Sequence, residues 1–331
     1  MCPAADDLSH LHRPVLLAEV LAHLDAQGLE QPGAVVVDGT VGLGGHAEAI
    51  LEAFPHARLL GMDRDPQALA LAGQRLARFG ARARLVHGSY ATLAEALAAA
   101  GWPAPRAVLL DLGVSSLQLD RAERGFSFRG GAAAPDMRFD ATEEGSTAAD
   151  LVNHAREEDL ARVLFEYGGE VRARAVARAL VRGRPFRSVE QLAAAIRGSA
   201  LRRGRIDPAT RSFQALRMWV NDEPGHLARG LAAALAALAP GGRLLVICFH
   251  SGEERAVKEA FRGAQRTGQG VVVTRKPIRS SEQEEQHNPR ARPARLRVFE
   301  RSVGGGTVGG GQGAGRDAGH GTQDEGSGTQ A

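Results

Sequence analysis

Runs of aliphatic residues alternate with amphipathic segments through the first third of the chain. The aliphatic runs predict β-strands at 35–38, 59–62, 84–87 and 107–111, and the segments between them predict helices at 46–54, 66–79 and 90–100. An uninterrupted aliphatic run is typical of a parallel strand that is buried on both faces. The regular alternation of strand and helix therefore predicts an α/β fold with a doubly wound parallel sheet.

The pattern changes after residue 116. Helical spacing broken by glycine and proline predicts helices at 151–167 and 169–181, followed by helices at 213–220 and 227–238 and strands at 243–249, 271–274 and 295–300. We predict two sheet-forming segments, 1–116 and 215–302, that are separated by a mainly helical substrate-binding insertion at 117–214. Residues 303–331 are expected to form a disordered tail, because residues 304–331 contain twelve glycines and only one branched aliphatic side chain, Val308.

Acidic residues stand at the ends of three predicted strands, at Asp38, Asp63 and Asp111. Ligands of open α/β sheets bind at the carboxyl ends of the strands, and a buried carboxylate without a partner is costly. A glycine-rich turn follows Asp38, and Asp63 stands 21 residues after Gly42, where an acid reaches the hydroxyls of a ribose. Together these residues predict a cofactor that contains adenosine.

The identity of this cofactor depends on the rest of the chain. Gly42-x-Gly44-x-x-Ala47 satisfies the dinucleotide fingerprint, which favours a nicotinamide cofactor, and an ordinary strand-to-helix turn is the simplest alternative. The pair of strands predicted after the fifth strand instead resembles the antiparallel end of the sheet in S-adenosylmethionine-dependent methyltransferases. A second mononucleotide-binding half is not apparent, so the sequence favours S-adenosylmethionine.

Composition excludes several other classes of protein. Cys2 and Cys248 supply neither a disulfide framework nor a cysteine-based zinc site, and His46 has no second ligand at helical spacing, so we predict no metal ion. His250-Ser251 lacks the G-x-S-x-G elbow of a hydrolase. The sequence shows neither an export signal nor a membrane-spanning run, so we expect a cytoplasmic protein without a membrane partner.

Basic residues are concentrated in the second half of the predicted insertion. Between Arg172 and Arg211 there are eleven arginines against two acids, Glu190 and Asp207. A face of this density indicates a partner that carries phosphates, and a solvated helical surface is the alternative.

The chain resembles the ribosomal RNA small-subunit methyltransferase H family over residues 10–301, because a series of motifs occurs in the same order as in that family. They are His12-Arg13-Pro14, Asp38 to His46, Asp63-Arg64-Asp65-Pro66, His87-Gly88-Ser89-Tyr90, Asp111-Leu112-Gly113-Val114-Ser115-Ser116, Gln118-Leu119-Asp120, Arg124-Gly125-Phe126-Ser127-Phe128, Asp136-Met137-Arg138, the segment 208–215, Phe249-His250-Ser251 and Asn288-Pro289-Arg290. The resemblance implies a Rossmann-like class I methyltransferase sheet with a helical insertion. It also implies methylation, dependent on S-adenosyl-L-methionine, of the N4 amine of a cytidine in the decoding region of 16S ribosomal RNA within the small ribosomal subunit.

The resemblance also implies which residues contact the cofactor: Gly44, Gly45, His46, Asp63, Tyr90, Asp111 and Gln118. The amine of cytosine is a weak nucleophile, so a proton acceptor should assist the transfer, and the candidates are Asp111 and His250. The alternatives are that Asp111 only contacts the cofactor and that His250 is hydrogen-bonded within its turn. A homodimer is kept as an alternative to a monomer.

Two further alternatives concern the RNA. Phe126 and Phe128 either stack on an extruded base or pack in the core. A non-enzymatic ribosome-assembly factor with the same fold is expected to lack the acids and glycines of the cofactor loop, and this chain retains them.

Overall fold

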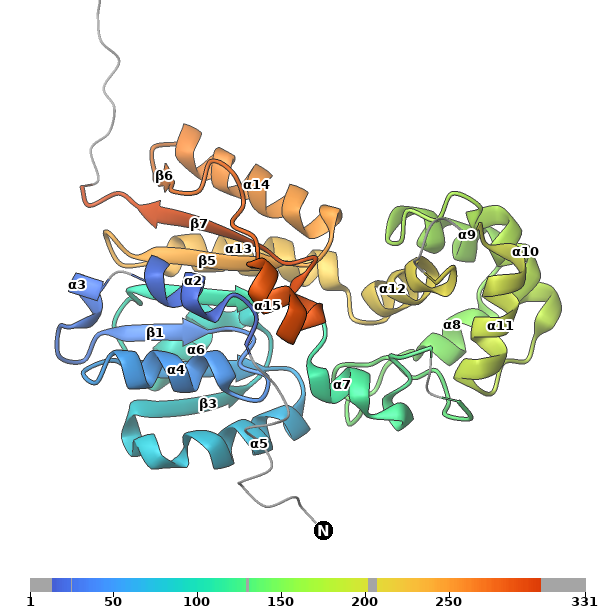
Figure 1. The fold of residues 1–331 in the computed structure, drawn as a ribbon, viewed down its shortest axis with the longest axis horizontal. Coiled ribbons are helices and arrows are strands. Elements are labelled where there is room, and N and C mark those ends of the chain that lie inside the picture. Colours follow the sequence, from blue (N-terminus) through green and yellow to red (C-terminus); the bar gives the residue numbers. More distant parts are fainter. Residues whose placement is uncertain (1–13, 25, 129–130, 202–206, 305–331) are drawn as a thin grey trace, which may run out of the picture.

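The computed structural model describes residues 14–24, 26–128, 131–201 and 207–304. The predicted disordered tail lies outside the described residues from position 305 on, as do Arg202, Arg203 and Arg205 of the basic stretch. The described chain forms two parts, a sheet with helices on both faces and a separate group of helices beside it (Figure 1). None of the described helices is long and apolar enough to cross a membrane.

The first part is built on a seven-stranded sheet of order β3-β2-β1-β4-β5-β7-β6. Its strands are β1 (Val35–Asp38), β2 (Arg58–Asp63), β3 (Ala83–His87), β4 (Ala107–Asp111), β5 (Arg243–Cys248), β6 (Gly270–Val272) and β7 (Arg295–Arg301). Strands β1 to β5 pair in parallel, whereas β7 is antiparallel to both β5 and β6. The predicted doubly wound α/β fold with an antiparallel end is therefore confirmed.

Helices cover both faces of this sheet because successive strand residues point to opposite sides. Val36 and Leu109 pack with α2 (Leu17–His23), α4 (Gly45–Ala53) and α5 (Pro66–Leu76). Val37 and Leu110 pack on the other side with α6 (Leu93–Ala100), α13 (Glu223–Ala237) and α14 (Ser251–Arg266). Shorter elements complete this part: α3 (Ala26–Leu29), η2 (Ala77–Arg82), η3 (Tyr90–Thr92), α15 (Glu282–His287) and η5 (Pro289–Ala291).

The helical part has a hydrophobic core of its own. It contains α8 (Ala148–His154), α9 (Glu157–Glu166), α10 (Ala173–Gly183), α11 (Val189–Ser199) and α12 (Ala209–Val220), and α7 (Ser116–Asp120) and η4 (Ala122–Arg124) lead into it. The single helix predicted at 151–167 is wrong. The chain is extended at Ala155 and Arg156 (ψ 151° and 154°), so two helices form there.

Candidate functional site

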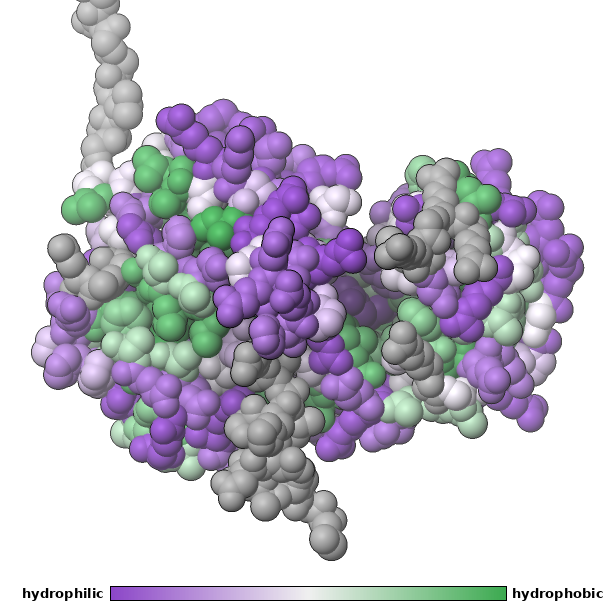
Figure 2. All heavy atoms as spheres, viewed as in Figure 1, coloured by the Kyte–Doolittle hydropathy of each residue, from purple (hydrophilic) through white to green (hydrophobic). Residues whose placement is uncertain are grey.

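A cavity of about 1070 Å³ opens at the carboxyl ends of the strands, between the sheet and the helical part. Figure 2 shows a recess at this position. Its volume slightly exceeds the range of roughly 300–1,000 Å³ that is typical of small-molecule sites, so it has room for more than one small ligand. The predicted site residues that line it are Gly45, His46, Asp63, Tyr90, Asp111, Gln118 and His250, whereas Gly44 does not.

The glycine-rich turn after β1 has two different reasons for its glycines. Gly42 and Gly44 have φ angles of +51° and +81°, a backbone conformation that residues with a side chain rarely adopt. Gly44 is also the N-cap of α4. At Gly45 a Cβ atom would lie 2.6 Å from Cγ of Pro14. The close approach that requires a glycine at position 45 is therefore to Pro14 of the protein itself.

Asp63 is held at the end of β2 by backbone donors. Its Oδ2 accepts a hydrogen bond from the N–H of Gly42 (2.8 Å) and its Oδ1 accepts one from the N–H of Asp65 (2.9 Å). Burial outweighs these bonds and raises the pKa of Asp63 to about 6. The carboxylate thus joins the glycine-rich turn to the β2 end and keeps further acceptor capacity toward the cavity.

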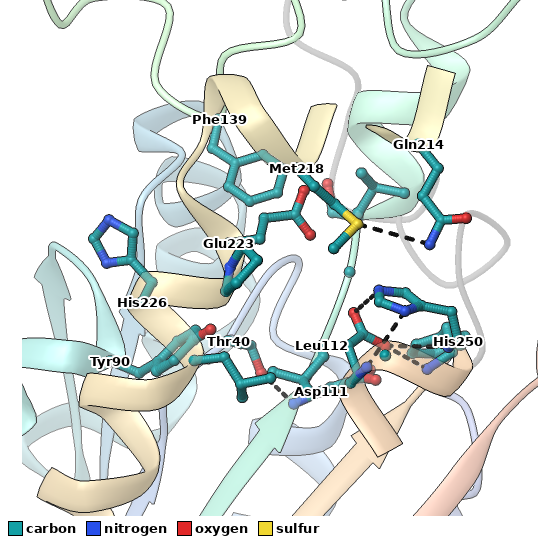
Figure 3. Close-up of a pocket in the computed structure, with 18 of the residues that line it drawn as sticks. Thr40, Tyr90, Asp111, Leu112, Phe139, Gln214, Met218, Glu223, His226 and His250 are labelled. Carbon is teal, nitrogen blue, oxygen red and sulfur yellow. Dashed lines mark hydrogen bonds and ion pairs between the residues drawn. The ribbon is translucent and has the colours of Figure 1, made fainter. Parts of the chain in front are cut away.

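Asp111 lies at the end of β4, on the floor of the cavity (Figure 3). The backbone N–H of Asp111 donates a hydrogen bond to the hydroxyl of Thr40 (2.6 Å). Nδ1 of His46 lies 3.7 Å from Oδ2 of Asp111. No hydrogen-bond donor among the described residues reaches the buried Oδ1. Burial, with the nearby charges of Asp38 and Glu253, raises the pKa of Asp111 well above its ordinary value. This arrangement fits a group that meets a proton donor from a ligand.

His250 is the N-cap of α14. Its Nδ1 accepts a hydrogen bond from the N–H of Glu253 (3.3 Å), and its Nε2 lies 3.0 Å from Oε1 of the same residue. Glu253 also accepts bonds from the N–H groups of Phe249 (2.7 Å) and His250 (3.2 Å). Burial acts to raise the pKa of Glu253, but these bonds and the imidazole hold it below its ordinary value. Nδ1 of His250 is therefore hydrogen-bonded within the turn, whereas the buried Nε2 faces Oε1 of Glu253 without a hydrogen bond.

Tyr90 and Gln118 are held by neighbours in different ways. A Cβ at Gly230 of α13 would lie 2.2 Å from the Tyr90 ring, so the absence of a side chain there makes room for the ring. Gln118 accepts a hydrogen bond from the N–H of Ser115 (3.0 Å) and donates one to Oδ2 of Asp65 (3.1 Å). Tyr90 presents an aromatic surface at the cavity, whereas the amide of Gln118 is already engaged within the protein.

Sequence reasoning missed a buried ion pair that joins the two parts. Arg124 of η4 donates to Oδ2 of Asp65 (2.8 Å) and to the carbonyl oxygens of Arg138 (3.0 Å) and Phe139 (2.8 Å). Asp65 and Arg124 are 1% and 6% exposed. Both residues belong to motifs of the family resemblance, Asp63-Arg64-Asp65-Pro66 and Arg124-Gly125-Phe126. These motifs were the sequence feature that could have indicated the pair.

The residues of the cavity wall that faces the strand ends were also not predicted from the sequence. Figure 3 shows Gln214, Met218 and Glu223 across the cavity from Asp111 and His250. These three side chains belong to α12 and to the start of α13, about 100 residues after β4. Further residues of the rim are Phe165, Glu166, Tyr167, Arg211, Arg255, Glu259 and Arg290.

Several residues considered for RNA contacts have structural partners. Phe126 is buried and its ring centroid lies 5.8 Å from that of Phe139, while Phe128 packs edge-on against Phe213, which is the core-packing alternative. Arg184 donates to the carbonyl of Val152 (2.7 Å) and caps α8, so it is not a free cation of the basic stretch. Arg290, which lines the cavity but lies outside the basic stretch, donates to Oδ1 of Asp120 (2.7 Å) in α7.

One group of potential metal ligands lies among the described residues, made of His87, Asp140 and Glu143. Nε2 of His87 lies 2.9 Å from Oδ2 of Asp140 and 3.1 Å from the carbonyl oxygen of Arg64. These contacts connect the end of β3 to the segment that enters the helical part, so a direct His–Asp pair accounts for the group.

Residues 9–302 match the model of the MraW methylase family. Two proteins named ribosomal RNA small subunit methyltransferase H are 48% and 47% identical to this chain, one from a Nocardioides strain and one from Geobacter sulfurreducens. Each alignment covers 88% of this chain, and 97% and 98% of the respective relative. A solved structure of an rRNA methylase from Streptococcus thermophilus covers 85% of this chain and 96% of its own, with 14% identity and a TM-score of 0.41.

Proposed function

The chain belongs to the MraW methylase family, and on that premise we propose that it methylates the N4 amino group of a cytidine in the decoding region of 16S ribosomal RNA. It is a methyltransferase whose cofactor is S-adenosyl-L-methionine. The observation that carries the proposal is a cavity that combines Asp63 and Asp111 at the strand ends with a wall from the helical part. One side of this cavity suits the adenosine of the cofactor, and the other suits a base.

The residues at the strand ends fit the cofactor chemically. Asp63 accepts hydrogen bonds from ribose hydroxyls, Tyr90 packs on the adenine, and the turn at Gly44, Gly45 and His46 supports both. The buried Oδ1 of Asp111, which no described donor reaches, fits a donor on the cofactor or on the acceptor base. Gln118 is the weakest of these assignments, because Asp65 and Ser115 already bind its amide.

Asp111 is the proton acceptor in this proposal. When bound, the cofactor supplies an electrophilic methyl group on a sulfonium. As the bond from N4 to carbon forms and the bond from carbon to sulfur breaks, Asp111 takes the proton that the nitrogen loses. His250 then orients the start of α14 beside the acceptor, because both of its ring nitrogens face Glu253.

Cofactor binding should weaken below about pH 6. Burial raises the pKa of Asp63 to about 6 in the free protein, and only its ionised form accepts from both ribose hydroxyls. The complex therefore binds fewer protons than the free protein, and affinity should fall about tenfold for each pH unit below 6. We would titrate the protein with S-adenosylhomocysteine by calorimetry between pH 5 and pH 7.5.

The control is Asp63→Asn, which should bind more weakly and without this pH dependence. This control separates Asp63 from Asp38 and Asp111, whose pKa values are also raised. A wild-type affinity that stays constant from pH 7.5 to pH 5 would contradict the role given to Asp63.

The basic face of the helical part is proposed to bind RNA phosphates. Arg174, Arg178 and Arg182 are exposed and recur every fourth residue on α10, opposite its buried Val176 and Leu180. Such a stripe presents its charges along one line, as a nucleic-acid backbone does. Arg178 also pairs with Glu157 (3.4 Å), so Arg174 and Arg182 are the better residues to test.

The double variant Arg174→Glu, Arg182→Glu should weaken RNA binding about tenfold or more and leave cofactor binding unchanged. Two lost phosphate contacts should also reduce the slope of log affinity against log salt by about 1.4–1.8. Arg262→Glu, Arg266→Glu is the matched control, because it makes the same charge change at exposed positions of α14 that do not line the cavity. Equal loss in both double variants would mean that net charge, not the α10 face, governs binding.

The experiment that tests the proposed substrate is transfer of labelled methyl from S-adenosylmethionine to small ribosomal subunits that lack the modification. Incorporation into the RNA, and not into ribosomal protein, is the expected result. No incorporation into subunits from several assembly stages, with cofactor binding intact, would favour the non-enzymatic assembly factor.

A further inference from the structure

Phe165 is an exposed aromatic residue at the rim of the cavity. The core face of α9 consists of Leu160, Val163 and Leu164, all buried, whereas Phe165 is 64% exposed. The ring of Phe165 is therefore accessible to a ligand that enters the cavity. Phe165 also lines the cavity, which Val171, the other strongly exposed apolar residue nearby (59%), does not.

The backbone around Phe165 is held in place by close packing of α9 on α12. At Gly168 a Cβ would lie 2.4 Å from the carbonyl oxygen of Arg211 and 2.9 Å from Cβ of Ala215. Gly169 follows with a φ of +60° and turns the chain away. The end of α9 is therefore fixed against α12, and Phe165 has a defined position on the rim.

The neighbours of Phe165 on the rim suit a nucleic acid strand. Arg211 and Arg255 are exposed and line the same cavity, where they can meet phosphates. The carboxylates of Glu166 and Glu259 also line this rim, so charge alone does not fix where a strand lies. An aromatic ring adds a contact with the base itself, because any unpaired base can stack on it, whereas the arginines contact only the phosphates.

We propose that Phe165 is a stacking platform for an unpaired base of the RNA that enters the cavity, on the side opposite the cofactor residues. This inference rests on the proposed function and names the residue that recognises single-stranded RNA there. It assigns to Phe165 the stacking role that the buried Phe126 and the half-buried Phe128 do not take.

The test is binding of a short unpaired RNA oligonucleotide that carries 2-aminopurine, whose fluorescence falls when it stacks on an aromatic ring. The full chain with S-adenosylhomocysteine should quench the probe. Phe165→Ala should bind about 5- to 150-fold more weakly, the range for loss of one base–aromatic stack, and should leave the probe unquenched. Phe165→Trp should restore both, and Phe165→Leu should not, because it is apolar without a ring.

Val171→Ala is the matched control and should bind as the wild type does. In methylation assays the same loss should appear in KM for RNA more than in kcat, since the ring is remote from the transferred methyl group. Equal binding by wild type, Phe165→Ala and Phe165→Leu would overturn the stacking role even if the enzyme methylates RNA. If Phe165→Ala lost RNA binding but the wild-type protein methylated no RNA, the stacking platform would be supported and the proposed reaction would be contradicted.

Discussion

Asp111→Asn should lower kcat for methyl transfer about 100- to 10,000-fold, the usual range for loss of a general base. Asparagine keeps the size and an oxygen acceptor, so the affinity for S-adenosylhomocysteine should change by less than about tenfold. Because burial raises the pKa of Asp111 and the ionised form is the base, wild-type kcat should increase as pH rises through that pKa. The variant should lack this increase.

Asp38→Asn is the matched control for this substitution. Asp38 also ends a strand and is also buried with a raised pKa, but it does not line the cavity. At pH values above the pKa of Asp111, the kcat of Asp38→Asn should stay within a few-fold of the wild-type value. Its rise with pH should move to lower pH, because the charge of Asp38 helps to raise the pKa of Asp111. If Asp111→Asn kept its kcat and lost cofactor affinity, Asp111 would be a cofactor contact only, which is the alternative that the sequence left open.

Arg124→Ala should lower the free energy of unfolding by about 3–5 kcal/mol, because it leaves the buried carboxylate of Asp65 without its cation. The carbonyl oxygens of Arg138 and Phe139 lose their guanidinium donor as well. The pair joins the loop after β2 to the chain that enters the helical part, so the loss should also loosen the cavity. Equilibrium unfolding in urea measures this free energy.

Arg121→Ala is the control for the arginine side chain itself. Arg121 is half exposed, donates to Gln67 (3.2 Å) and lies 4.0 Å from Glu123, so its removal should cost less than about 1 kcal/mol. The double variant Asp65→Ala, Arg124→Ala should be more stable than the sum of the two single losses predicts. A cost below about 1 kcal/mol for Arg124→Ala would show that the pair does not hold the two parts together.

The strand ends were predictable from the sequence because buried parallel strands leave a local signal. Val35 to Val37 is an aliphatic run that ends in Asp38, and the same pattern before Asp63 and Asp111 placed three acids at one edge of the sheet. Each of these predictions needed only the strand and the residue after it. The parallel order of the sheet then brought Asp63 and Asp111 to one cavity.

The opposite wall was not predictable in this way, because tertiary packing decides it. Phe126 and Phe165 are both followed by a polar residue, yet one is buried and the other is 64% exposed. Their burial depends on contacts with Phe139 and on the packing of α9 against α12, which no local pattern encodes. His250 likewise showed a polar residue after a predicted strand, but only the structure shows that its Nδ1 accepts from the N–H of Glu253 while its Nε2 lies 3.0 Å from Oε1 of Glu253 without a hydrogen bond.

The position of the methyl group in the product is the most direct test of the proposed reaction. Small ribosomal subunits methylated with labelled S-adenosylmethionine would be digested to nucleosides, and the labelled nucleoside would be identified by chromatography and mass spectrometry. The expected product is N4-methylcytidine from the decoding region, and Asp111→Asn should abolish it. Label on a ring carbon, on a ribose oxygen or on another base would contradict the proposed acceptor and the role of Asp111 as its base.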